Sequence, residues 1–177
     1  MKFDKFYKLL VESPAPIILT IKHGKTVKDE GINLQAYTFM GELFGYDLFV
    51  QIDGSVTRYY LLDKSRTDIM LSVVLHKLGK YQTVNSSWKA KDAERGLMSR
   101  FFKEFLIPKY HVLESGNLHT EFAKQFWINF IKNNIDSYKI SFVQNGHETR
   151  IDNLMILKVE IPYIWKYSTI TLRIYGK

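Results

Sequence analysis

Apolar residues recur along the chain at two spacings, about every second position in some stretches and every third or fourth in others. The first spacing is typical of strands with one buried face, and the second is typical of amphipathic helices. Strand patterns, or short runs rich in β-branched and aromatic residues, occur at residues 16–23, 37–43, 46–52, 56–63, 69–77, 81–88, 111–115, 138–143, 154–161 and 165–175. Asp53-Gly54 is a tight-turn dipeptide between two of these runs and predicts a hairpin.

Three segments have helical spacing. The first covers residues 1–13 and ends before Pro14; the second is expected to begin at a cap on Asp92 and to stop near Pro108. The third is capped by Asn117 or Thr120 and runs to about Asn133. Their apolar stripes are Phe3, Phe6, Tyr7 and Leu10, then Leu97, Phe101 and Phe105, and then Leu118, Phe122, Phe126 and Phe130.

This order of elements predicts the class of fold. A meander of strands is followed by helix, strand and helix, and closing strands complete the chain, with a polar loop expected at residues 144–153. The pattern indicates an α/β (α+β) protein with a single mainly antiparallel mixed sheet flanked by helices. A chain of 177 residues with 46% hydrophobic residues is long enough for one core, so we expect a single domain over 1–177, with 1–13 as its N-terminal amphipathic helix.

Composition narrows the functional classes. Cysteine is absent, which excludes disulfides and thiolate metal sites, and the five histidines show no ligand spacing, so no metal is expected. The sequence contains no apolar run of spanning length, and we expect no membrane partner and a cytoplasmic protein. The formal net charge of +7 favours anionic partners. Because Lys and Arg are scattered, a solvated basic surface is the simplest interpretation.

Two stretches carry a resemblance to a known family: YQTVNSSWKAKDAERGLMSRFFKEFL from Tyr81, and HVLESGNLHTEFAKQFWINFI from His111. With the order of elements, they resemble the GNAT superfamily of N-acyltransferases, and within it the small divergent GNAT-like proteins of bacteriophages. In that family a loop of pattern Arg/Gln-x-x-Gly-x-Gly/Ala receives the pyrophosphate of CoA at a helix start. The resemblance implies an acetyl-CoA cleft at 85–89, 95–99 and 112–115.

The cofactor loop follows the family pattern in part. With Gly96 on the central glycine, Ala93 stands at the Arg/Gln position and Met98 at the final small position. A helix N-terminus with free amides attracts a pyrophosphate, while Asp92 and Glu94 add negative charge there. The side chain of Met98 therefore decides whether the loop is open. The residues expected to contact the cofactor are Asn85, Ser87, Trp88, Lys89, Arg95, Gly96, Leu97, Met98 and Ser99.

Catalysis of amine acylation calls for a base, for donors to the thioester carbonyl and for an acid. Many family members are described as using a Tyr on the helix after the fifth strand, where this chain has Phe122, Phe126 and Trp127. The candidate catalytic residues here are Glu114, Ser115, His119 and Tyr110.

Three functions remain open from the sequence. The first is a GNAT-like N-acyltransferase that transfers an acetyl group from acetyl-CoA to an amine. The second is a catalytically inactive GNAT-fold phage protein that binds a host or virion protein. The third is a basic nucleic-acid-binding module whose rings stack on bases. The rings that suggest this third function are Tyr37, Phe39, Phe44, Tyr46, Phe49, Tyr59 and Tyr60.

Overall fold

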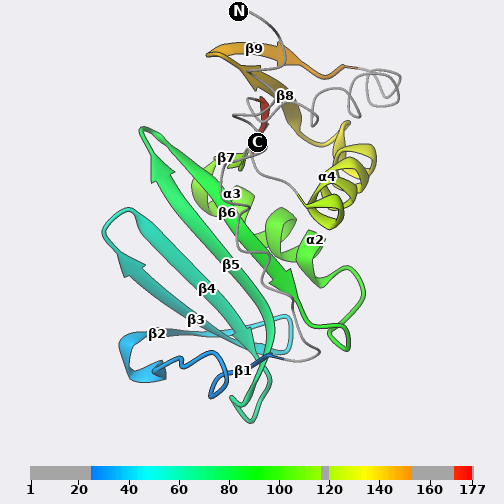
Figure 1. The fold of residues 1–177 in the computed structure, drawn as a ribbon. Coiled ribbons are helices and arrows are strands. Elements are labelled where there is room, and N and C mark those ends of the chain that lie inside the picture. The colour runs from blue at the N-terminus through cyan, green and yellow to red at the C-terminus, as the bar shows by residue number, and fades with distance from the viewer. Residues whose placement is uncertain (1–24, 117–119, 153–169, 177) are drawn as a thin grey trace, which may run out of the picture.

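One twisted sheet dominates the structure, a computed structural model that describes residues 25–116, 120–152 and 170–176. In these residues the sheet has ten strands in the order β2-β3-β4-β5-β6-β7-β10-β8-β9, with β1 paired to β5 (Figure 1). The strands are β1 (Lys25–Thr26), β2 (Thr38–Leu43), β3 (Tyr46–Asp53), β4 (Val56–Leu62), β5 (Asp68–Leu78), β6 (Tyr81–Lys89), β7 (Val112–Ser115), β8 (Lys139–Gln144), β9 (His147–Arg150) and β10 (Ile170–Tyr175).

The crossover between β6 and β7 consists of a loop at residues 90–96 followed by a continuous helical stretch. This stretch contains α2 (Leu97–Phe101), a π-helical segment η2 (Phe102–Leu106) and α3 (Ile107–Tyr110). A second helix, α4 (Glu121–Asn134), follows β7, and a short 3-10 turn η1 (Leu34–Ala36) precedes β2. Pro108 has no N–H to donate to the carbonyl one turn earlier, and the widened π turn before it accommodates this loss.

The sheet is antiparallel except at one pair. Strands β6 and β7 run parallel, and the helical crossover joins them, as a parallel connection requires. Strand β10 then enters between β7 and β8, antiparallel to both. The predicted class, a mainly antiparallel mixed sheet flanked by helices, is confirmed. The succession of β6, crossover helix, β7 and α4 is the order of elements predicted from the sequence.

Most predicted boundaries in the described residues agree with the structure to within one or two residues, notably those of β2 to β7 and β8. Thr120 is the cap of α4, because its hydroxyl accepts a hydrogen bond from the amide of Ala123 at 3.2 Å. The predicted helix at 1–13 and strands at 16–23 and 154–161 lie outside the described residues, as do residues 165–169 of the last predicted strand.

Two sequence expectations were wrong, the start of the crossover helix and the loop at 144–153. The crossover helix begins at Leu97 rather than at a cap on Asp92, because Ala93 is buried in the core and the chain bends around it. The helix ends at Tyr110, close to the expected stop near Pro108, and the π turn before Pro108 accommodates its missing N–H. The polar loop expected at 144–153 contains strand β9, which pairs with β8.

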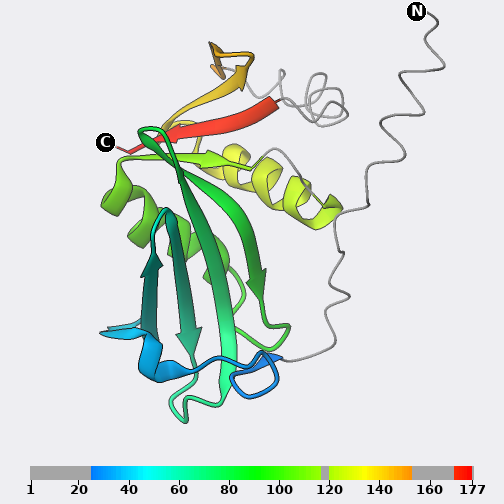
Figure 2. The same ribbon diagram turned by 60° about the vertical axis from the view of Figure 1, so that its left-hand side comes forward.

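All three helices contribute to one core on one side of the sheet (Figures 1 and 2). Alternate residues of β5, Leu71, Val73 and Leu75, are fully buried there. Phe102 of the crossover packs edge-on against Trp127 of α4, with ring centroids 5.3 Å apart. This contact joins the two helices. A smaller cluster of Phe49, Leu62 and Ile69 packs with Val27, Ile32, Leu34 and Tyr37 of the residues before β2.

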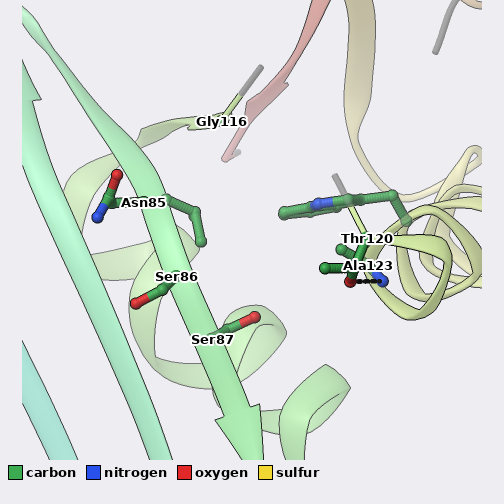
Figure 3. A pocket seen from close by; sticks show the side chains of 8 residues that line it. Asn85, Ser86, Ser87, Gly116, Thr120 and Ala123 are labelled. Carbon is green, nitrogen blue, oxygen red and sulfur yellow. Dashed lines mark hydrogen bonds between the residues drawn. The ribbon is translucent and has the colours of Figure 1, made fainter. Parts of the chain in front are cut away.

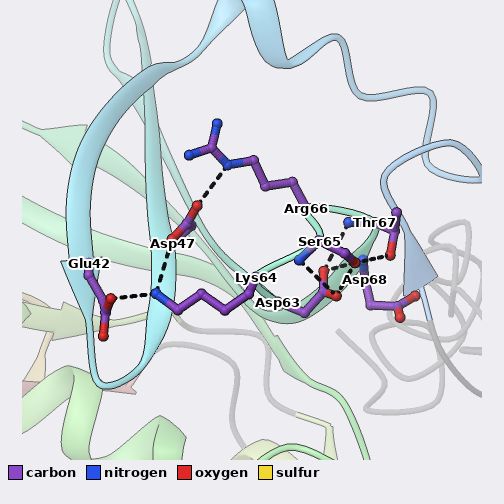
Figure 4. Close-up of polar contacts among 8 residues, drawn as sticks. All are labelled: Glu42, Asp47, Asp63, Lys64, Ser65, Arg66, Thr67 and Asp68. Carbon is purple, nitrogen blue, oxygen red and sulfur yellow. Dashed lines mark hydrogen bonds and ion pairs between the residues drawn. The ribbon is translucent and has the colours of Figure 1, made fainter.

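The connection between β4 and β5 is held by its own polar groups (Figure 4). The carboxylate of Asp63 accepts hydrogen bonds from the amides of Thr67 at 2.9 Å and Asp68 at 2.8 Å. Arg66, which has a positive φ of 59°, donates from Nε to the carboxylate of Asp47 at 2.7 Å. Because these side chains form hydrogen bonds within the turn and to β3, their role is to stabilise the fold.

Removal of the Phe102 ring should separate the crossover helix from α4. The ring is fully buried and contacts Phe126, Trp127 and Phe130, so Phe102→Ala should lower the free energy of unfolding by about 3–5 kcal/mol in urea titrations. Phe122→Ala on α4 is the control, because that side chain is 90% exposed, and its effect should stay within about 0.5 kcal/mol. Equal losses in the two variants would contradict this packing.

Candidate cofactor cleft

The parallel strands β6 and β7 pair over three positions and then separate. The register matches Gln82 with Leu113, Thr83 with Glu114 and Val84 with Ser115. Beyond Val84, β6 continues to Lys89 with β5 as its neighbour. At the point of separation, a Cβ on Gly116 would lie 2.7 Å from the carbonyl oxygen of Val84, so a glycine is needed for this close approach.

A cavity of about 150 Å³ lies where the strands separate. Figure 3 shows Asn85, Ser86 and Ser87 of β6 along one side and Thr120 and Ala123 of α4 across from them. The register between β5 and β6 shifts at Asn85, which makes this residue a bulge that re-aims the strand. The residues lining the cavity are Val84, Asn85, Ser86, Ser87, Gly116, Thr120, Ala123 and Trp127.

Strand β6 presents an open edge to this cavity. Half of the backbone N–H and C=O groups of a strand point to each neighbour, and β7 pairs with β6 only as far as Val84. From Asn85 to Lys89, no strand in the described part of the chain pairs with β6 on that side. Such an edge can bind an extended ligand that carries amide groups.

The start of α2 provides further free donors. Its first amides follow Gly96, which has a φ of 87°. The amide of Leu97 donates to the carbonyl of Glu94 at 3.1 Å, and that of Arg100 donates to Gly96 at 2.9 Å. The amides of Met98 and Ser99 have no acceptor among the residues that the structure describes, as is usual in a first helical turn.

A groove of about 370 Å³ runs from this helix start toward the end of α4. Arg100 is held there by Glu94 and Glu104, at 3.5 Å from each. Arg95 and Lys103 have no ion-pair partner within the described ranges, so their charges are available to a ligand. The groove is lined by Glu94, Arg95, Gly96, Ser99, Arg100, Lys103, Glu104, Phe130, Asn133 and Asn134.

The residues predicted to hold a cofactor fall into three groups. Asn85 and Ser87 line the cavity, and Arg95, Gly96 and Ser99 line the groove. Cofactor contact by these residues remains a prediction.

Two predicted residues pack into the core. Leu97 is fully buried, and Met98 packs against the same cluster instead of lining the groove. The bulk of Met98 therefore leaves the groove beside the helix start open.

The remaining two predicted residues have other contacts. Trp88 packs against the smaller cluster. Lys89 donates from Nζ to the carbonyls of Ala90 at 2.7 Å and Ala93 at 3.0 Å. Lys89 thus orders the loop before α2.

The three candidate catalytic residues that the structure describes, Tyr110, Glu114 and Ser115, contact different partners. Oε1 of Glu114 accepts hydrogen bonds from Nε and Nη2 of Arg173, at 2.8 and 2.6 Å. The buried hydroxyl of Ser115 accepts from the amide of Leu172 at 2.9 Å and donates to the carbonyl of Gly116 at 3.1 Å.

Tyr110 and His119 complete this set. The hydroxyl of Tyr110 lies 2.5 Å from that of Tyr59 in a hydrogen bond, where burial and this bond raise the pKa of Tyr59 far above its usual range. His119 lies outside the described residues. The catalytic roles of Glu114, Ser115, His119 and Tyr110 remain predictions.

Glu114 belongs to a charged cluster on the other face of the sheet. Its neighbours in β7, Leu113 and Ser115, are buried on the helix side, so alternation directs Glu114 away from the cavity. Arg173 bridges Glu114 to Glu148, which it contacts from Nη1 at 2.7 Å. The three charged residues come from β7, β9 and β10, so the sequence alone could not predict that they lie together.

Several residues of the cavity were missed in the sequence. Ser86 lay inside the predicted cleft at 85–89 without being named as a cofactor contact, and Gly116, Thr120, Ala123 and Trp127 of the opposite wall were not predicted as contacts. One signal was present: Asn85-Ser86-Ser87 is a run of small polar residues inside a predicted strand, which is unusual for a strand buried between two neighbours. The opposite wall carries no such signal.

Three further features considered from the sequence are a metal site, a membrane-spanning helix and a nucleic-acid-binding surface. Within the described ranges, no three His, Asp or Glu side chains gather as metal ligands, and no helix has the length and apolarity to span a bilayer. Of the rings that suggested nucleic-acid stacking, Phe49 and Tyr59 are buried and Phe39 is 47% exposed. Nucleic-acid binding remains a prediction.

Comparison with known proteins shows similarity at the level of structure, and this similarity is distant. No family model matches the chain, and no curated protein matches it. Among solved structures, it is similar to a candidate acetyltransferase of the GNAT family from Bacteroides thetaiotaomicron, with a TM-score of 0.37 and 12% identity over 70% of this chain. The chain spans 63% of the length of that protein. Function must therefore be inferred from the cleft.

The charged cluster should make stability depend on pH in acid. Partial burial alone would raise the pKa of Glu148, but hydrogen bonds from Tyr175 and Arg173 lower it from 4.5 to about 2. A lowered carboxyl pKa stabilises the fold above about pH 4.5, and this contribution is lost as the pH falls toward about 2. Glu148→Gln should cost on the order of 1–2 kcal/mol near neutral pH.

Thermal unfolding of both proteins across this pH range would check the prediction. The two stability curves should converge as the pH falls through the window. Asp152→Asn is the control, because its carboxylate is 67% exposed in a pair with Arg150 and should contribute little. Curves for Glu148→Gln and the unmodified chain that stay parallel down to about pH 2 would contradict the role of Glu148.

Proposed function

We propose that this chain is a GNAT-like N-acyltransferase that uses acetyl-CoA and acylates an amine. The observation that carries the proposal is the open edge of β6 beside the cavity where β7 separates. The pantetheine arm of CoA contains two amides, and such an arm can pair with a strand edge as a peptide does. Asn85 to Ser87 would hold it along one wall, with α4 on the other.

The groove at the start of α2 supports binding of the phosphates. The free amides of Met98 and Ser99 suit a phosphate oxygen, and Arg95 and Lys103 add positive charge at the groove wall. Glu94 and Glu104 lie there too, but both are paired with Arg100. The groove therefore keeps two cations for an anionic ligand.

Acetyl-CoA supplies an activated thioester to the site. Transfer breaks the bond between the acyl carbon and sulfur and forms a bond from that carbon to the nitrogen of the neutral amine. The proton that the amine loses is taken up by the departing thiolate, which is released as the free thiol. Amide donors on the β6 edge would polarise the thioester carbonyl. The hydroxyls of Ser87 and Thr120, which line the cavity, would orient the reacting groups.

A second candidate function has an observation in its favour. Glu114 is ion-paired with Arg173 and Ser115 is hydrogen-bonded within the sheet. In the described residues, both side chains therefore stabilise the pairing of β7 with β10. This favours a catalytically inactive GNAT-like protein that binds another protein, such as a host or virion component.

Isothermal titration of acetyl-CoA into the purified chain tests cofactor binding. Arg95→Glu should weaken binding about tenfold or more, because it replaces a cation in the groove by an anion. Arg150→Glu is the matched control, since it changes the net charge equally on strand β9 and should leave the affinity unchanged. Equal weakening in the two variants would indicate non-specific attraction, and no binding by the unmodified chain would overturn the proposal.

Turnover separates the two candidate functions. Release of free thiol from acetyl-CoA in the presence of a panel of amines would support the acyltransferase. Binding of acetyl-CoA without transfer to any amine would favour the inactive protein.

A further inference from the structure

Trp127 of α4 occupies an unusual position in the cleft. Its side chain lines the cavity, yet the residue is only 3% exposed. Its ring packs edge-on against Phe102 at 5.3 Å, Phe126 at 5.0 Å and Phe130 at 6.0 Å between centroids. These rings fix the indole, so its N–H is presented in a defined place.

The indole N–H has no acceptor among the residues that the structure describes. In the described residues the fully buried side-chain atoms without a partner are Oε1 of Gln82 and Oγ of Ser141, so Nε1 of Trp127 keeps some accessible surface although its ring is packed. A tryptophan N–H in such a place usually has a hydrogen-bond partner. The neighbouring stripe positions on α4, Phe122, Phe126 and Phe130, carry phenylalanine. Phenylalanine would also fill an apolar site at 127, so the packing alone does not account for the indole.

The residues that line the cavity indicate which kind of acceptor would form a hydrogen bond with this N–H. An indole N–H donates and cannot accept or titrate, so it needs an oxygen with a free lone pair. Among the described residues that line the cavity, no side chain carries a charge, whereas the cations Arg95 and Lys103 lie in the groove. A neutral carbonyl therefore suits the cavity, and a phosphate suits the groove.

We propose that Trp127 positions the acyl donor by donating its indole N–H to a carbonyl oxygen of the acyl-pantetheine arm. This inference rests on the proposed binding of acetyl-CoA. Two carbonyls of the same chemistry could be the acceptor: that of the thioester and that of a pantetheine amide. CoA lacks the first and keeps the second, so a comparison of acetyl-CoA with CoA identifies the source.

Nuclear magnetic resonance of the indole groups provides the direct readout. The chain has three tryptophans, and Trp127→Phe assigns the Trp127 signal by its loss from a ¹⁵N-labelled sample. Titration with acetyl-CoA should move this Nε1–H signal downfield. A shift with both acetyl-CoA and CoA identifies the pantetheine amide as acceptor, and a shift with acetyl-CoA alone identifies the thioester. An unmoved Trp127 signal under saturating acetyl-CoA would overturn the proposal.

Affinity of the same variant gives a second test. Trp127→Phe keeps an aromatic ring and removes the donor, so it should weaken acetyl-CoA binding about three- to tenfold. Phe126→Leu is the control, because Phe126 belongs to the same ring cluster and does not line the cavity. A Trp127→Phe variant that stays folded and binds as tightly as the unmodified chain would refute the role of the N–H. Failure of the unmodified chain to bind either acetyl-CoA or CoA would instead overturn the proposed function.

Discussion

The separation of two parallel strands is the constraint on which the rest of this structure depends. Strands β6 and β7 share three residue pairs, and β6 then continues without a further strand on that side in the described part of the chain. A strand edge with unpaired backbone groups inside a protein is unfavourable unless a ligand, water or another element satisfies it. The cavity beside Asn85 to Ser87 follows from this separation. The groove at the start of α2 lies at the other end of the same crossover.

Aromatic packing holds the strands apart. Phe102 of the crossover and Trp127 of α4 meet behind the cavity, and each is almost fully buried. Because these rings are large and closely packed, α4 cannot move toward β6 and close the gap without loss of core contacts. The same ring cluster that stabilises the fold therefore also maintains the cleft and orients the indole of Trp127, which lines it.

The two faces of the sheet have different roles. On the helix side, neutral hydroxyl, amide and indole groups line the cavity. On the other side, Arg173 gathers Glu114 and Glu148 into a closed network. The sequence suggested a catalytic role for Glu114 because this residue lies near the end of the strand that borders the expected cleft. Alternation along β7 directs it to the opposite face, where its charge is balanced by Arg173, so the cleft does not gain a carboxylate from this position.

Hydrophobic periodicity by itself determined the strands from β2 to β8 and the extent of α4, because those patterns reflect which residues are buried in each element. Element order also predicted the mixed sheet. Only the tertiary structure decided that the crossover helix starts at Leu97, since burial of Ala93 ends the preceding loop. It likewise decided that Trp127 and Ser87 face one cavity and that Arg173 reaches Glu114. These contacts join residues distant in sequence, and the register and packing that create them leave no local pattern along the chain.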